Sequence, residues 1–213
     1  DLTSGSITGK LVKLAIPIMG VAFIQTAYSL IDMIWIGKLG SSALAAVGTA
    51  GFFTWLAEAF MMLTKLGVSI KVSQSIGQKN FEKTKQYIMS ALQMNLVISI
   101  LYGLFLVGMN QTLINFFKLG DANVIEMART YLVTVGFGMA FSFSGPVFSG
   151  IFNGLGDSKT PFLINTIGLV VNMFLDPVLI FGLWGAPSLG VFGAALATVF
   201  AQIVVTLCFI IVV

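Results

Sequence analysis

The chain has 213 residues, of which only 9% are charged and 57% are hydrophobic. A soluble domain carries about 25% charged residues, so this composition excludes a soluble fold and indicates a membrane protein. Histidine is absent and Cys208 is the single cysteine, which excludes histidine-based catalysis, histidine metal sites and an internal disulfide. The net charge of +3 comes from scattered lysines and indicates membrane topology rather than nucleic-acid binding.

Six apolar segments are long enough to cross a hydrocarbon core of about 30 Å, which needs about 20 helical residues. They cover residues 11–37, 43–67, 87–109, 125–150, 161–183 and 192–213. The sequence therefore predicts an all-α, polytopic membrane protein with six transmembrane helices, each of which satisfies its own backbone hydrogen bonds. Residues 78–85 are expected to form a solvated loop.

The distribution of basic residues predicts the orientation of the chain. With a cytoplasmic N-terminus, seven lysines fall on the cytoplasmic side and three basic residues on the opposite side, and such an excess marks the cytoplasmic face. We therefore expect both ends of the chain in the cytoplasm and the helices in the plasma membrane. Lys65, near the cytoplasmic end of its segment, can extend its ammonium group to the interface.

Three acidic residues lie well inside the predicted spans: Asp32, Glu58 and Asp176. A carboxylate in hydrocarbon costs at least about 2.5 kcal/mol, so such a residue indicates function. Asp32 follows Pro17 by 15 residues, and Asp176 follows Pro161 by 15 residues. Both aspartates therefore lie about 22 Å along helices that run in the same direction, and we expect them in the outer half of the membrane at similar depth.

Polar residues share the helix faces of these aspartates. They are Gln25 and Tyr28 in the first span, Asn165 and Asn172 in the fifth, and Thr198, Gln202 and Thr206 in the sixth. We expect Asp32, Asn172, Asp176 and Thr198 to surround one pocket, which could hold a proton or bind sodium through Asp32, Asn172 and Asp176. Gln25, Tyr28, Asn165 and Gln202 are expected to contact the substrate or to support the site. Alternatively, the aspartates lie near the interface and bond to helix ends.

Pro17 and Glu58 each allow two interpretations. Pro17, followed by Gly20, predicts a kinked or loosened first helix, and protonation of Asp32 could change the bend; a static kink fits the sequence equally well. Glu58 either faces a central cavity, where it would attract cationic substrates, or pairs with a neighbouring helix.

Several motifs in the sequence resemble those of the multidrug and toxic compound extrusion (MATE) transporters. They are Asn153–Pro161, Leu175–Pro177, Ile36–Gly40, Val72–Gly77 and Gly193–Thr198. The resemblance implies a secondary antiporter of two six-helix lobes, which expels amphipathic, often cationic compounds in exchange for protons or sodium ions. It implies neither enzyme activity nor a cofactor.

The same resemblance suggests a role for individual residues. Pro17, Asp32, Asn172, Asp176 and Thr198 match the cation site of the N-terminal lobe in prokaryotic members. Residues 1–213 would then be this lobe, which requires the C-terminal lobe of the same protein as its partner and is not expected to transport alone.

Two other membrane functions are alternatives to efflux. A lipid-linked glycan flippase of the same superfamily needs several basic residues to bind pyrophosphate, whereas Arg129 is the single arginine and lies near an external end. An uncoupled scaffold or channel is a further alternative, although no filter loop or repeated polar ring is visible.

Overall fold

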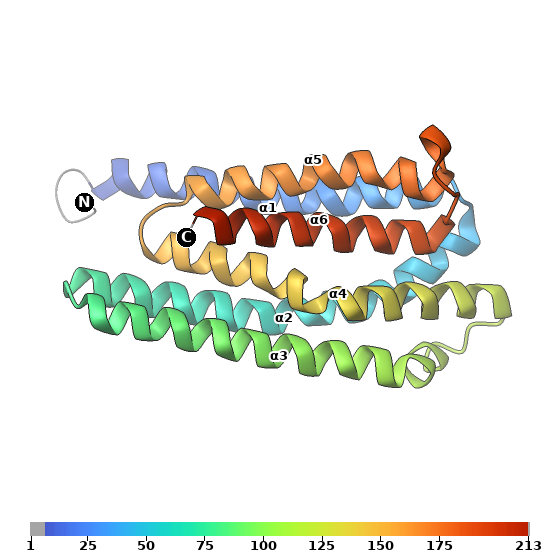
Figure 1. Cartoon of the computed structure of the whole chain (residues 1–213), viewed down its shortest axis with the longest axis horizontal. Helices are drawn as coiled ribbons and strands as arrows, with labels where there is room; N and C mark the ends of the chain where they lie inside the picture. Colours follow the sequence, from blue (N-terminus) through green and yellow to red (C-terminus); the bar gives the residue numbers. More distant parts are fainter. Residues whose placement is uncertain (1–6, 213) are drawn as a thin grey trace.

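The computed structural model describes residues 7–212, which form six long helices joined by short connections (Figure 1). The helices are α1 (Ile7–Gly37), α2 (Ser41–Gly77), α3 (Phe81–Asn115), α4 (Ala122–Gly154), α5 (Lys159–Phe181) and α6 (Gly190–Val212), with a short 3-10 helix, η1 (Leu183–Gly185), before α6. All six long helices are apolar enough to cross a membrane. The all-α, multi-pass fold predicted from the sequence is therefore confirmed.

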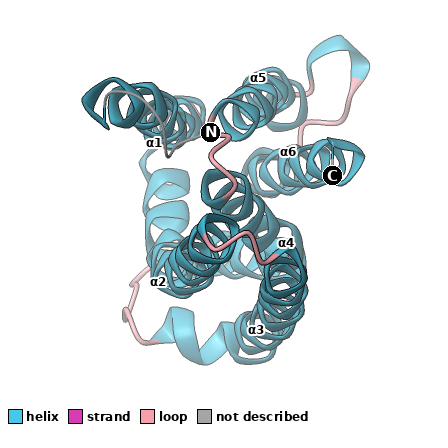
Figure 2. Cartoon of the chain, turned by 90° about the vertical axis from the view of Figure 1, so that its left-hand side faces the viewer, coloured by secondary structure: helices cyan, strands magenta, loops and turns pink. Residues whose placement is uncertain are grey.

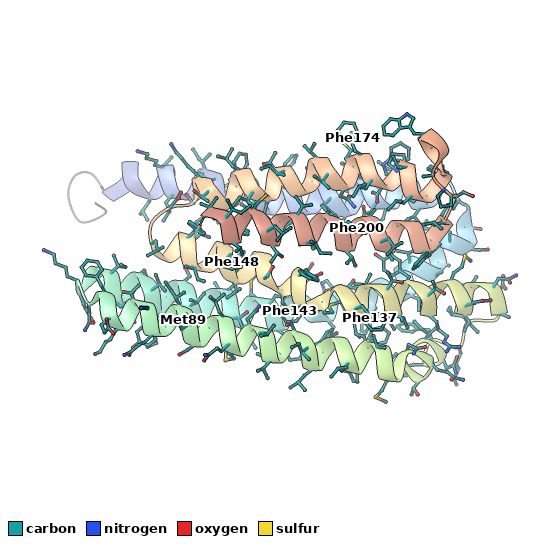
Figure 3. The ribbon with its side chains drawn as sticks, in the orientation of Figure 1. Met89, Phe137, Phe143, Phe148, Phe174 and Phe200 are labelled. Carbon is teal, nitrogen blue, oxygen red and sulfur yellow. The ribbon has the colours of Figure 1, made fainter. Side chains whose placement is uncertain are left out.

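Helix α4 is the centre of the bundle. It packs on α2, α3 and α6, while α5 packs on α1 and α6. Seen down the bundle, α1, α5 and α6 lie on one side, α2 and α3 lie on the other, and α4 lies between them (Figure 2). Phe143 of α4 is fully buried, whereas Phe174 of α5 is exposed and projects from the outer surface (Figure 3). Phe174 thus lies on an outward face, as expected for contact with lipid.

Several helices extend beyond the predicted spans. Helix α2 was expected over 43–67 but continues to Gly77, and its 37 residues correspond to about 55 Å. The expected loop over 78–85 was wrong, because α3 already begins at Phe81. The Asn80 side chain accepts a hydrogen bond from the Lys83 backbone N–H at 3.1 Å, so it caps α3. A helix as long as α2 exceeds a hydrocarbon core of about 30 Å, so its charged end turns can extend into water.

Asp157 fixes the start of α5. Its Oδ1 accepts hydrogen bonds from the backbone N–H groups of Lys159 at 3.0 Å and Thr160 at 3.2 Å, and its Oδ2 accepts one from the Thr160 hydroxyl at 2.6 Å. Partial burial raises the pKa of Asp157, but these hydrogen bonds and the Lys159 charge outweigh burial and hold it below its usual value. The ionised carboxylate therefore stabilises the helix that carries Asn172 and Asp176.

Two glycines allow helices to approach without an intervening side chain. A Cβ atom at Gly150 of α4 would lie 2.5 Å from the Lys65 carbonyl oxygen of α2, and one at Gly193 of α6 would lie 2.6 Å from the Leu179 carbonyl carbon of α5. Both distances are shorter than ordinary van der Waals contacts. These glycines therefore set the spacing between the helix pairs that surround the site described below.

Candidate functional site

A cavity of about 430 Å³ lies among five of the six long helices. Helices α1, α2, α4, α5 and α6 all contribute to its wall, and α3 does not contribute a lining residue. Its polar lining includes Gln25, Tyr28, Asp32, Glu58, Lys65, Tyr131, Asn165, Thr198 and Gln202. The cavity is therefore where most of the residues selected from the sequence come together.

Two carboxyl groups from different helices lie against each other at one end of this cavity. Asp32 of α1 adjoins Asp176 and Asn172 of α5 and Thr198 of α6. Asp176 and Asn172 are fully buried, whereas Asp32 is half-buried and lines the cavity. The four residues expected to surround one pocket thus lie close together, but only Asp32 and Thr198 line the cavity, whereas Asn172 and Asp176 lie behind its wall.

Hydrogen bonding at the carboxyl pair is incomplete. The Asn172 Nδ2 atom donates to Asp176 Oδ1 at 3.2 Å. Within residues 7–212, Asp32 Oδ1, Asp176 Oδ2 and Asn172 Oδ1 are buried and have no hydrogen-bond partner. Two carboxylates in contact repel each other unless a proton or a cation lies between them. The free oxygens form a ligand set that suits a proton or a hard cation such as sodium.

The sequence allowed two positions for the aspartates, a pocket within the membrane or a place near the interface, and the structure combines features of both. Asp32 lies five residues before the end of α1, and Asp176 lies five residues before the end of α5, so both are about 7 Å from the C-terminal ends of their helices. The pair is therefore close to the end of the bundle that holds the α1–α2 and α5–α6 connections, yet the Asp176 side chain has no exposed area. Neither aspartate caps a helix end.

Two tyrosines complete the surroundings of the aspartates. Tyr28, one turn before Asp32, lies beside the Thr198 hydroxyl. Thr198 itself donates to the Ala194 carbonyl oxygen at 3.1 Å, so its lone pairs remain free to accept. Tyr131 of α4 lies near both aspartates and was not identified from the sequence. The sequence gives the depth of Tyr131 along the fourth span, but the depth of a residue does not show in which direction its side chain points.

The remaining selected residues lie elsewhere along the cavity. Gln25 and Glu58 are exposed on its wall, so Glu58 faces the cavity rather than a neighbouring helix. Asn165 and Gln202 line a different part of the cavity from the carboxyl pair, and Asn165 Nδ2 donates to the Pro161 carbonyl oxygen at 2.7 Å. Lys65 also lines the cavity, where the sequence suggested only an extension to the interface.

Pro17 and Thr206 lie away from both the cavity and the carboxyl pair. Pro17 lies within α1, which is continuous from Ile7 to Gly37, and it is not among the lining residues. Thr206 was placed on the same stripe as Thr198 and Gln202, but it is buried and bonds to the Ser144 hydroxyl of α4. The physical reason is that α4 packs closely on α6, which turns this part of the stripe inward.

Comparison with known proteins gives one family. The MatE family model matches residues 17–178. A probable multidrug resistance protein NorM from Thermotoga maritima is 29% identical over 199 residues, which are 92% of this chain and 42% of the relative. A probable multidrug resistance protein YoeA from Bacillus subtilis is 32% identical over 190 residues, which are 88% of this chain and 41% of the relative.

A solved structure supports the same relationship. The outward-facing conformation of a multidrug resistance MATE family transporter superimposes with a TM-score of 0.83 and 29% identity, and the match covers 96% of this chain and 44% of that one. The chain therefore spans less than half the length of the relatives that it matches.

Proposed function

Because the chain belongs to the MatE family, we propose that it is the N-terminal lobe of a multidrug efflux antiporter driven by protons or sodium ions. The single observation that supports coupling to a cation is that Asp32 and Asp176, from separate helices, adjoin each other, with Asp176 fully buried and Asp32 half-buried. The names of the relatives, multidrug resistance proteins, support efflux of drugs. Covalent catalysis and a cofactor have no part in this mechanism.

The proposed site works by charge neutralisation. A proton or sodium ion between Asp32 and Asp176 removes the repulsion of two adjoining carboxylates. Asn172 holds Asp176 through its hydrogen bond of 3.2 Å, and Thr198 offers a further oxygen. Because Asp32 lies on α1 and Asp176 on α5, loss of the cation weakens the contact between these helices. Binding of the cation thereby favours one arrangement of the lobe over another.

The substrates and partners follow from this proposal. Small amphipathic cations would enter the cavity, where Glu58 supplies negative charge, and Gln25, Tyr28, Asn165 and Gln202 supply polar contacts. The second lobe of the same protein would complete the translocation path, since the chain covers 44% of a related transporter. We place the protein in a bacterial inner membrane with both ends of this lobe in the cytoplasm.

Transport under separately imposed pH and sodium gradients tests the proposal. In vesicles containing the full-length transporter, Asp32→Asn and Asp176→Asn should each abolish gradient-driven drug export while the protein remains folded. Glu126→Gln, a change at an exposed acid on α4, is the matched control and should transport normally. Unchanged export by both aspartate variants would refute the coupling role and favour an uncoupled protein.

The same assay separates the flippase alternative. Translocation of a lipid-linked glycan without any drug export would favour that function. The lining residues of the described chain argue against it, because Lys65 is the one basic residue among them, and a pyrophosphate group is bound best by several cations.

A further inference from the structure

One face of α2 forms a wall of the cavity that ends in a lysine. Thr54, Glu58, Met61 and Lys65 all line the cavity, and their spacing of three to four residues places them on one helix face. Lys65 lies seven residues beyond Glu58 and therefore about 10 Å farther from the outer end of α2. The cavity thus has acidic groups toward its outer end and an ammonium group toward its inner end.

The position of Lys65 is fixed by close packing between α2 and α4. A Cβ atom at Gly150 would lie 2.5 Å from the Lys65 carbonyl oxygen and 3.1 Å from its Cα atom, so no side chain separates the two helices here. Along α4, Gly150 lies 19 residues beyond Tyr131, which corresponds to about 28 Å. Tyr131 marks the level of the aspartates, so the Lys65 backbone is far from the cation site proposed above.

The Lys65 charge is not compensated by the protein. Its side chain is half-buried, and Glu58, the one acidic residue of the same helix, is seven residues and about 10 Å away along the axis. A partly desolvated ammonium group without a counter-ion is unfavourable, and a ligand that carries the opposite charge relieves this cost.

Gln202 of α6 supplies a second polar side chain to the cavity. A Cβ atom at Gly145 would lie 3.9 Å from Gln202 Oε1, and Gly145 precedes Gly150 by five residues, about 7 Å along α4. Lys65, Gly145 and Gln202 all line the same cavity, so a group bound between α2 and α6 can be approached by the Lys65 ammonium from one side and by the Gln202 amide from the other. Both can donate hydrogen bonds to an oxyanion.

We propose that Lys65 and Gln202 form a subsite for a single carboxylate of an amphipathic substrate. This inference rests on the proposed function, because it takes the cavity as the place where substrate binds. The apolar body of the substrate would lie along Met61 and Met62 on the cavity wall, whose flexible thioether side chains adapt to different shapes. A positively charged group, where present, would point toward Glu58 and Asp32. The substrates would thus include amphipathic zwitterions.

Two dyes that differ only at the relevant group test this subsite. Rhodamine 110 carries a free carboxylate, and rhodamine 123 is its methyl ester. Binding of each is measured by fluorescence anisotropy with the full-length transporter in micelles that contain no phospholipid. Lys65→Gln should weaken binding of rhodamine 110 about ten-fold, as expected for loss of a charged hydrogen bond, and leave rhodamine 123 unchanged. Lys65→Arg should retain binding of rhodamine 110.

The controls make the result independent of folding and of coupling. Each variant is judged by the ratio of its affinities for the two dyes. A general loss of folded protein lowers the binding of both dyes equally and leaves this ratio unchanged. Lys71→Gln, at an exposed lysine of the same helix, should leave the ratio unchanged. An unchanged ratio in Lys65→Gln would overturn the subsite; this is also the outcome expected if Lys65 binds lipid headgroups, because headgroups are absent from the micelles.

The experiment also separates this inference from the proposed function. Binding is measured without any gradient, so the dye ratio does not depend on cation coupling. If Asp32→Asn fails to affect export, coupling is refuted while the Lys65 ratio still stands. If the ratio is unchanged but Asp32→Asn abolishes export, the carboxylate subsite alone is refuted.

Discussion

The most informative test of the fold changes a glycine that touches no charged group. A Cβ atom at Gly193 of α6 would overlap the Leu179 carbonyl of α5, with the carbonyl carbon only 2.6 Å away. The contacting atom belongs to the backbone, so no side-chain rotation can relieve the overlap. Ordinary carbon contacts are about 3.5–4.0 Å, and Gly193→Ala therefore requires α5 and α6 to separate by about 1 Å.

This separation acts directly on the proposed cation site. Leu179 lies three residues after Asp176 on α5, and Gly193 lies five residues before Thr198 on α6. Overpacking of this kind costs about 1–3 kcal/mol of stability. We predict that Gly193→Ala lowers the midpoint of thermal unfolding in detergent. It should also weaken cation binding by about ten-fold, because the oxygen ligands of the cation lie on both α5 and α6.

The same substitution elsewhere provides the control. A Cβ atom at Gly108 of α3 would meet no atom within 4 Å, and alanine is favoured over glycine in a helix by about 1 kcal/mol. Gly108→Ala should therefore leave cation binding unchanged and raise the unfolding midpoint slightly. Equal unfolding midpoints for Gly193→Ala and Gly108→Ala would show that the α5–α6 spacing is not fixed as described.

Three further predictions concern stability. The pKa of Asp157 is held below its unfolded value, so its stabilisation is fully present above the unfolded pKa of about 3.9 and is lost as the pH falls through the lower folded pKa; unfolding midpoints measured between pH 6 and pH 3 should fall less in Asp157→Asn than in the wild type. Tyr102→Phe removes a hydrogen bond of 2.6 Å to the Phe53 carbonyl oxygen and should cost about 1 kcal/mol, measured by reversible unfolding in detergent; no change would mean that water replaces the donor. Phe143→Ala in the centre of α4, where the side chain is fully buried, should cost about 3–5 kcal/mol in the same assay, and a cost below 1 kcal/mol would contradict close packing around this ring.

Properties that depend on position along one helix could be predicted from the sequence. The six spans follow from the length of apolar runs, and the matched depth of Asp32 and Asp176 follows from the constant rise per residue. The structure brings these two residues into contact. The helix ends were harder to place, because polar residues beyond the hydrocarbon core form helix or loop at similar cost. This is why α2 continues to Gly77, ten residues past the expected end.

Properties that depend on rotation about a helix axis could not be predicted in the same way. The facing of Lys65 into the cavity results from the contact of its backbone with Gly150, a residue 85 positions later. The inward turn of Thr206 depends on its partner Ser144 of α4. Tyr131 reaches both aspartates because α4 lies at the centre of the bundle. Each of these contacts depends on packing between segments that are distant in the chain. No local pattern in a single sequence shows such packing.

The position of Tyr131 leads to a final prediction about the cation site. Its side chain is buried and lies near both Asp32 and Asp176. Ionised carboxylates can only accept hydrogen bonds, whereas the tyrosine hydroxyl can donate one. The hydroxyl lies near the two carboxyl groups but is not hydrogen-bonded to them, and we predict that it donates to an ionised carboxylate when the cation has left. A hydrogen bond to a charged group contributes about 1.5–3 kcal/mol. Tyr131→Phe keeps the ring and removes only this hydroxyl, so the fold should persist while the ionised pair is less well stabilised.

The expected consequence is a change in the affinity of the pair for its cation. Without the hydroxyl, the ionised carboxylates depend more strongly on a bound proton or sodium ion, so cation affinity should rise about ten-fold or more and release should slow. Stopped-flow measurement of cation release from the full-length protein would show this, with Tyr87→Phe, at an exposed tyrosine of α3, as the matched control. A release rate in Tyr131→Phe equal to that of the control would mean that the hydroxyl makes no contact with the ionised pair, and the stabilisation of the empty site would then have to come from Asn172 and Thr198 alone.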